Sequence, residues 1–176
     1  MVNLYLLRHG ETEENVRHIL QGHMPGTLTP QGMQQAATAA HALLPIPFDT
    51  MLVSDLHRCT HTADILFSEW QRMGKHPLPK RTSTPLLRER DWGSATGMVV
   101  SPEHRITIPD DVESISAIKA RARIFLDFVS QTYPHQTVLA VSHGFFCRIL
   151  QVVFYNKEIA DIQPMKNVET RCLQLP

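Results

Sequence analysis

Two histidines have neighbours that suit chemistry at a ligand. His9 directly precedes Gly10, and His143 directly precedes Gly144. Neutral imidazole is a nucleophile, and because its ordinary pKa lies near 6.5, much of it is unprotonated at pH 7. A neighbouring glycine lets backbone approach a ligand closely. The segment around His9 therefore predicts a nucleophilic imidazole, and His143, if protonated, adds a donor on the opposite side.

Arginines lie near both histidines and suit a phosphate ligand. Arg8 precedes His9, and Arg58 follows a second apolar segment. Their forked N–H groups match phosphate oxygens, and Asn15 adds an uncharged donor. Each residue alone is more typical of a surface ion pair or a loop. Together they predict phosphoryl transfer, which depends mainly on positioning and on charge stabilisation.

An alkoxide leaving group needs a proton, and Glu89 is the candidate acid. It lies between Arg88 and Arg90, so an ion pair with either neighbour is the alternative interpretation. Asp91 is the substitute donor if Glu89 is occupied in this way.

Apolar spacing predicts the elements that position these residues. Strands are expected over 2–7, 50–54, 83–87 and 137–142, with an edge strand over 168–173. Helices are expected over 30–43, 55–72, 112–131 and 145–154. Strands separated by helices predict an α/β fold of three layers, α/β/α, with a mostly parallel central sheet. Ligands of such sheets bind at the carboxyl ends of the strands, where the polar residues named above fall.

Length and composition restrict the other possibilities. The chain has 176 residues, which predicts a single domain over 1–176, and 17 basic residues balance 17 acidic ones. This balance gives no reason to expect nucleic acid or a membrane as partner. No apolar run approaches the roughly 20 residues that span a bilayer. Three cysteines without paired spacing favour a cytoplasmic protein, and the oligomeric state is left open.

Residues 8–12 with Asn15 resemble the first signature of the histidine phosphatase superfamily, the phosphoglycerate mutase-like proteins. Residues 54–63, 87–89, 113–114 and 142–148 resemble its later motifs, in the same order. The resemblance spans nearly the whole chain and implies a phosphoglycerate mutase-like fold without metal or organic cofactor. It implies that His9 is phosphorylated and that Glu89 donates the proton.

The resemblance also implies a binding role for other residues. It makes Arg8, Arg58 and His143 the phosphate pocket. The further ligand contacts that we expect are Gly10, Asn15, Gln21, Gly22 and Gly144.

Four departures from the family pattern lie on loops near the expected substrate. They are Pro25, Phe145, Val112 and the pair Ala95-Thr96. They leave the chemistry intact and the natural substrate open.

The segment from Gly97 to Glu113 is short, about fifteen residues, where mutases of the family carry a long insertion. A short lid leaves a phosphohistidine open to water, so we expect a phosphomonoester hydrolase, with mutase-type phosphoryl transfer as the alternative. The expected substrate is a small phosphorylated metabolite, such as α-ribazole phosphate or a sugar phosphate, with phosphoprotein as a further possibility. Ser101 to Asp111 is expected to border the entrance.

Two functions from other classes are weighed beside this one. His57 and His61 lie four residues apart on a predicted helix, a spacing that can hold zinc, although a solvated helix face explains them better. A phosphate-binding module without catalysis would share the arginines, but it would not need both the nucleophile and the acid.

Overall fold

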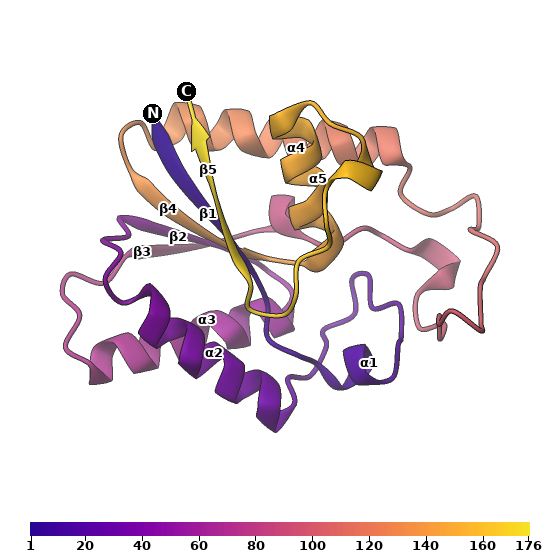
Figure 1. Ribbon diagram of the computed structural model, residues 1–176, viewed down its shortest axis with the longest axis horizontal. Coiled ribbons are helices and arrows are strands. Elements are labelled where there is room, and N and C mark those ends of the chain that lie inside the picture. The colour runs from indigo at the N-terminus through magenta and orange to yellow at the C-terminus, as the bar shows by residue number, and fades with distance from the viewer.

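A five-stranded mixed sheet forms the centre of the molecule, and the computed structural model describes residues 1–176 around it (Figure 1). The strand order is β3-β2-β4-β1-β5. The strands are β1 (Val2–Arg8), β2 (Thr50–Ser54), β3 (Lys80–Thr84), β4 (Thr137–Ser142) and β5 (Thr170–Leu175). Neighbouring strands run parallel except at the β1–β5 edge, which is antiparallel. The expected mostly parallel sheet is confirmed.

Helices cover both faces of this sheet and complete the three layers. They are α1 (Glu13–Val16), α2 (Pro30–Leu43), α3 (His57–Arg72), α4 (Ile115–Thr132) and α5 (Gly144–Tyr155). Figure 1 shows α2 and α3 on one face of the sheet and α4 and α5 on the other. This α/β architecture is the one expected from the alternation of strands and helices.

Each face of the sheet packs against its helices through a separate apolar cluster. Leu4 and Leu6 of β1 point toward α4 and α5, where they join a cluster that contains Phe125. Leu7 points to the other face and joins a cluster that contains Trp70. Successive side chains of a strand alternate between faces, so one apolar strand supplies both cores.

The parallel register brings the ends of three strands to one edge. Arg8 at the end of β1 lies opposite Ser142 at the end of β4, and Val53 of β2 pairs with Val141 of β4. The chain therefore leaves β1, β2 and β4 at nearly the same level. This register explains how segments far apart in the sequence converge.

The weakest predicted strand was placed wrongly. The structure puts β3 at Lys80–Thr84 and gives Pro85–Leu87 a 3₁₀ turn, instead of a strand over 83–87. Thr84 caps this turn through its hydroxyl, and Pro85 has no N–H for a strand ladder. The strand itself is polar because it lies at the sheet edge, so it carried no apolar pattern.

Several boundaries also differ from the expected ones. Helix α3 begins at His57 instead of residue 55, α4 at Ile115 instead of residue 112, and β5 spans Thr170–Leu175 instead of 168–173. The short helix α1 was not predicted. A capping box between Thr12 and Asn15 forms it, a local polar signal without apolar periodicity.

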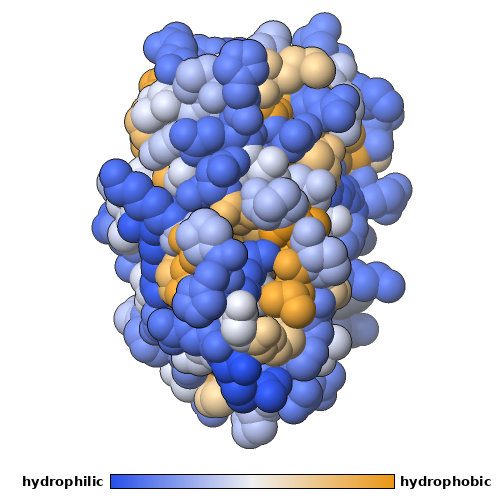
Figure 2. All heavy atoms as spheres, turned by 90° about the vertical axis from the view of Figure 1, so that its left-hand side faces the viewer, coloured by the Kyte–Doolittle hydropathy of each residue, from blue (hydrophilic) through white to orange (hydrophobic).

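A hollow of about 590 Å³ lies between the loops that precede β2 and β3, at the amino ends of these strands. Figure 2 shows this face, on which hydrophilic residues predominate and apolar ones gather around a depression. Lys75 donates to the carbonyls of Leu44 and Ile46 at 2.7 Å, so its charge joins two loops.

No helix of the chain is both long and apolar enough to cross a membrane.

Truncation of Phe125 tests the core beneath α4. Phe125 is fully buried, whereas its neighbour Ile124 is 58% exposed. We expect Phe125→Ala to lower the free energy of unfolding by about 3 to 5 kcal/mol, because it leaves a cavity. Ile124→Ala should change it by less than about 0.5 kcal/mol. Urea denaturation of both variants measures this, and equal effects would contradict the packing described.

Candidate active site

Two histidines and an arginine from three strand ends meet at the carboxyl edge of the sheet. The imidazole centroids of His9 and His143 lie 5.3 Å apart. Arg58 Nε lies 3.3 Å from Nε2 of His9 and 3.1 Å from Nδ1 of His143. All three side chains are almost fully buried, with at most 3% of their surface exposed. The structure thus brings together the imidazole pair that the sequence predicted.

The contacts of His9 determine its tautomer. Its Nδ1 lies 2.7 Å from the carbonyl oxygen of Gly10, which can only accept, so Nδ1 carries the hydrogen. Nε2 then holds a lone pair, and this atom faces Arg58 Nε. Burial, followed by the charges of Arg58 and Arg8, holds the pKa of His9 well below its usual range. His9 is therefore a neutral imidazole with Nε2 as its nucleophilic atom.

His143 is also neutral, with the opposite tautomer. Its Nε2 lies 2.8 Å from the Ser54 hydroxyl, and its Nδ1 accepts from Arg58. Burial, Arg58 and His9 hold the pKa of His143 well below its usual range. The condition for His143 to act as a donor through Nδ1, its protonation, is therefore not met in the site without phosphate, because the low dielectric and the neighbouring guanidinium both disfavour a second positive charge.

The two arginines are held by backbone carbonyls. Arg58 donates through Nη2 to Gly22 at 2.8 Å and through Nη1 to Met24 at 2.5 Å. Gly22 has φ +49°, a backbone conformation that residues other than glycine rarely adopt. Arg8 donates through Nη1 to Met165 at 2.7 Å, but its Nε is buried without an acceptor.

The carboxylate of Glu89 lies at the N-terminus of α5, the helix that begins directly after His143. Its Oε2 accepts from the amide of Phe145 at 3.1 Å, and its Oε1 accepts from that of Phe146 at 3.0 Å. The positive end of the helix dipole favours a carboxylate there. Neither neighbouring arginine forms an ion pair with Glu89, so that alternative interpretation is wrong.

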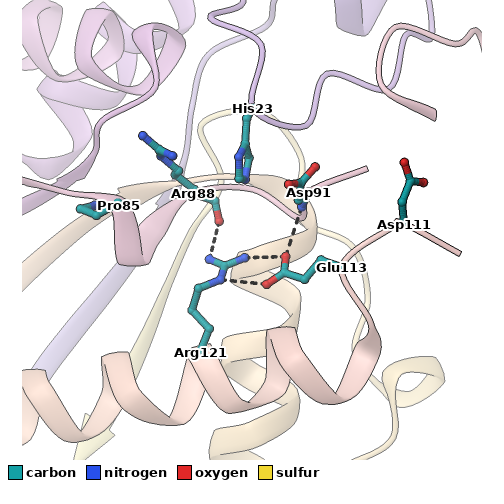
Figure 3. A pocket seen from close by; sticks show the side chains of 7 residues that line it. All are labelled: His23, Pro85, Arg88, Asp91, Asp111, Glu113 and Arg121. Atoms are coloured by element: carbon teal, nitrogen blue, oxygen red, sulfur yellow. Dashed lines mark hydrogen bonds and ion pairs between the residues drawn. The ribbon is translucent and has the colours of Figure 1, made fainter. Parts of the chain in front are cut away.

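Asp91 lines a polar pocket of about 360 Å³ to which neither His9 nor His143 contributes, and its Oδ1 accepts from the amide of Gly93 at 2.9 Å. Figure 3 shows the pocket with Glu113 and Arg121 at its base. The structure therefore favours Glu89 over Asp91 as the acidic residue beside the imidazole pair.

Arg121 braces the segment that carries Glu89, as Figure 3 shows in part. It forms a bidentate ion pair with Glu113, at 3.0 and 2.9 Å, and donates to the carbonyls of Leu86 and Arg88. Glu113 in turn accepts from the amide of Asp91. Sequence reasoning missed Arg121, because a partner eight residues away on a different element leaves no local pattern.

A second pocket, of about 650 Å³, opens beside Arg8. It is lined by Arg8, Glu11, Asn15, Val16, His18, Ile19, Leu20, Val100 and Asn167. Asn15 was expected at the site and lies there. The segment Ser101 to Asp111, expected at the entrance, contributes no residue to this pocket, which Val100 lines from that side, but Asp111 lines the pocket that contains Asp91.

Gln21, an expected ligand contact, is buried and lines neither pocket. Its Nε2 donates to the hydroxyl of Thr12 at 2.9 Å, and its buried Oε1 has no donor within the protein.

The two glycines that follow the histidines serve different contacts. A side chain at Gly10 would bring Cβ within 2.5 Å of the carbonyl oxygen of Gly32, so helix packing requires that glycine. A side chain at Gly144 would meet Arg8 Nε at 3.0 Å, so there the requirement comes from the site.

The pair His57 and His61 forms no metal-ligand group. Their rings lie 5.6 Å apart, and Nδ1 of His57 contacts the carbonyl of Gly26 at 3.2 Å. No set of three His, Cys, Asp or Glu residues lies in a geometry suited to a metal ion.

Buried imidazoles, two guanidinium groups and a helix N-terminus on an α/β sheet define a site for phosphoryl groups. The sequence profile described as "Histidine phosphatase superfamily (branch 1)" matches residues 4–175. The chain belongs to the histidine phosphatase superfamily, and it is a phosphatase with a phosphoglycerate mutase-like fold.

Relatives of known name agree with this class. The chain is 31% identical over 156 residues to an adenosylcobalamin/alpha-ribazole phosphatase of Escherichia coli, covering 81% of this chain and 73% of that protein. It is 30% identical over 148 residues to an uncharacterized phosphatase of Bacillus subtilis, covering 82% and 72%. A solved mycobacterial glucosyl-3-phosphoglycerate phosphatase superposes with a TM-score of 0.83 at 26% identity, covering 98% and 92%.

The neutral state of His9 predicts how stability depends on pH. The unfolded chain binds a proton at this imidazole below about pH 6.5, whereas the folded protein does not, so stability falls as pH decreases. Between pH 7 and 5 the contribution of one such histidine is about 2 kcal/mol. We expect His9→Asn to remove about 2 kcal/mol of the decrease in the free energy of unfolding between about pH 7 and pH 5. Urea denaturation of wild type and variant at both pH values measures this effect. If the free energy of unfolding decreased equally in both proteins, His9 would be protonated in the folded state.

Proposed function

We propose that the chain hydrolyses phosphomonoesters through a phosphohistidine on His9. The observation that carries this proposal is the position of His9 Nε2, which is buried 3.3 Å from Nε of Arg58. Burial and the charges of Arg58 and Arg8 lower the pKa of His9 and so favour the nucleophilic form. Histidine phosphatases in general work through such an intermediate. A phosphate dianion beside these arginines would meet donors that lack other partners, including Arg8 Nε.

The first step forms a bond between Nε2 of His9 and phosphorus and breaks the ester P–O bond. Arg8 and Arg58 stabilise the charge on the transferring group, and Asn15 and the free amide of Gly144 donate to its oxygens. The bound dianion favours a protonated His143, whose Nδ1 then becomes a donor. The leaving oxygen takes its proton from Glu89.

The second step returns the enzyme to its starting state. Water attacks phosphorus, Glu89 accepts a proton from it, and the P–N bond breaks to release phosphate and neutral His9. The short segment over 97–113 supports hydrolysis over mutase-type transfer. It lies mostly exposed. Its first residues bond to the rest of the chain through the backbone of Met98 and Val100, and its last ones through the side chains of Asp111 and Glu113.

We propose a small phosphorylated metabolite as the substrate. Relatives are named for α-ribazole and glucosyl-3-phosphoglycerate, which support this class without selecting one member. We further propose that residues 1–176 act as one domain, supported by a single sheet that includes all five strands. A cytoplasmic location is proposed on the three free cysteines.

Replacement of His9 tests the proposal directly. His9→Ala should abolish turnover of aryl phosphates and acid-labile phosphate labelling, because it removes the imidazole that the proposed mechanism phosphorylates. Circular dichroism should show an unchanged fold. His41→Ala, on the exposed side of α2, is the matched control and should keep wild-type activity. Turnover retained by His9→Ala would exclude the mechanism.

Glu89 is tested through the leaving group. Glu89→Gln should slow alkyl phosphates far more than aryl phosphates, by about 100-fold or more against less than about 10-fold, because only the alkoxide needs a proton. Asp91→Asn is the control and should slow both classes equally little. The kcat/KM ratio between the two ester classes measures the effect. A selective loss in Asp91→Asn would reassign the acid.

A further inference from the structure

A strained turn lies against the strand that carries the nucleophile. The turn over Lys166 to Glu169 is closed by a bond from the Glu169 amide to the Lys166 carbonyl at 3.1 Å. Val168 within it has φ +53°, which is unfavourable for a β-branched residue. Strained backbone of this kind persists where its surroundings determine it, often beside functional sites.

The turn is fixed to the backbone of the site itself. The amide of Val168 donates to the carbonyl of Arg8 at 3.0 Å and contacts that of His9 at 3.4 Å. The amide of Arg8 donates to the carbonyl of Glu169 at 3.3 Å. The strained conformation therefore places the preceding side chain, Asn167, over the nucleophile segment.

Asn167 uses its amide nitrogen for two contacts within the site. Its Nδ2 donates to the carbonyl of His9 at 3.1 Å and to Oδ1 of Asn15 at 3.3 Å. The reverse orientation of this amide would place an oxygen against two acceptor oxygens. Its orientation is therefore determined by its partners.

These contacts determine how Asn15 is oriented. Its Oδ1 accepts from the amide of Thr12 at 3.1 Å and from Asn167, which occupies both acceptor positions. Its Nδ2 forms no bond within the protein, and Asn15 lines the pocket beside Arg8. The free donor of Asn15 is thus available to a phosphoryl oxygen.

We propose that Asn167 is a positioning residue that holds the Asn15 amide with its N–H groups toward the phosphoryl group and fixes the carbonyl of His9. The inference rests on the proposed function and adds to it a residue that acts without touching the substrate. Its hydrogen-bonding pattern is specific, because only a donor at position 167 satisfies both the His9 carbonyl and Oδ1 of Asn15.

Two substitutions separate this role from a structural one. Asn167→Ala should weaken inhibition by orthophosphate about 10-fold, because Asn15 is no longer held. Asn167→Asp keeps the volume and the turn preference but offers acceptors, so Asn15 would rotate its donor toward position 167. We expect an equal or larger loss in Asn167→Asp, with the fold retained. Wild-type phosphate affinity in Asn167→Asp would overturn the inference, whether or not the alanine variant folds.

A double-mutant cycle with Asn15→Ala shows whether Asn167 acts through Asn15. In the Asn15→Ala background, Asn167→Ala should change the orthophosphate inhibition constant by less than about twofold. Fully additive effects would overturn the inference. Asn156→Ala, at the C-terminal end of α5, is the matched control and should keep wild-type phosphate affinity. The cycle is measured on enzyme whose turnover requires His9, so failure of the proposed function is detected separately.

Discussion

The site depends on one buried cation, the guanidinium of Arg58. Its Nε faces an acceptor nitrogen on each imidazole, and its two terminal nitrogens donate to backbone carbonyls. A buried charge is costly unless its donors are satisfied, and here part of that requirement is met by His9 and His143. Burial first, and then the charge of Arg58, keeps both rings unprotonated. Arg58 therefore contributes to the protonation state of both imidazoles, and its positive charge favours a negatively charged ligand.

The parallel sheet makes this arrangement possible. Arg8 and His9 leave β1, His143 leaves β4, and Arg58 lies in the first turn of the helix after β2. Because β4 lies between β2 and β1 in the sheet, His143 at the end of β4 lies between Arg58 and His9 along the strand order. Glu89 lies on the longer segment that follows the edge strand β3. Arg121 of α4 holds this segment in place by donating to the carbonyl of Arg88.

Much of this organisation could be predicted from the sequence, and the failures have physical causes. Apolar strands that end in polar residues indicated the fold and the imidazole pair. The polar edge strand β3 carried no apolar pattern and was misplaced. The protonation state of His143 depends on burial and on Arg58, which are tertiary facts. The partners of Arg121 and Asn167 lie on distant segments, so no local spacing reveals them.

The charge arrangement explains why the acid can share the site with a nucleophile. Glu89 is held by amides at the start of α5, one turn from the histidine that accepts from Arg58. Burial, followed by the charges of Arg58 and Arg8, keeps His9 unprotonated. A negatively charged ligand in this site would be repelled by the Glu89 carboxylate and attracted by the two guanidinium groups. The carboxylate and the imidazole therefore lie in different local fields although they share one site, because amides and a helix N-terminus surround Glu89 and guanidinium groups surround His9.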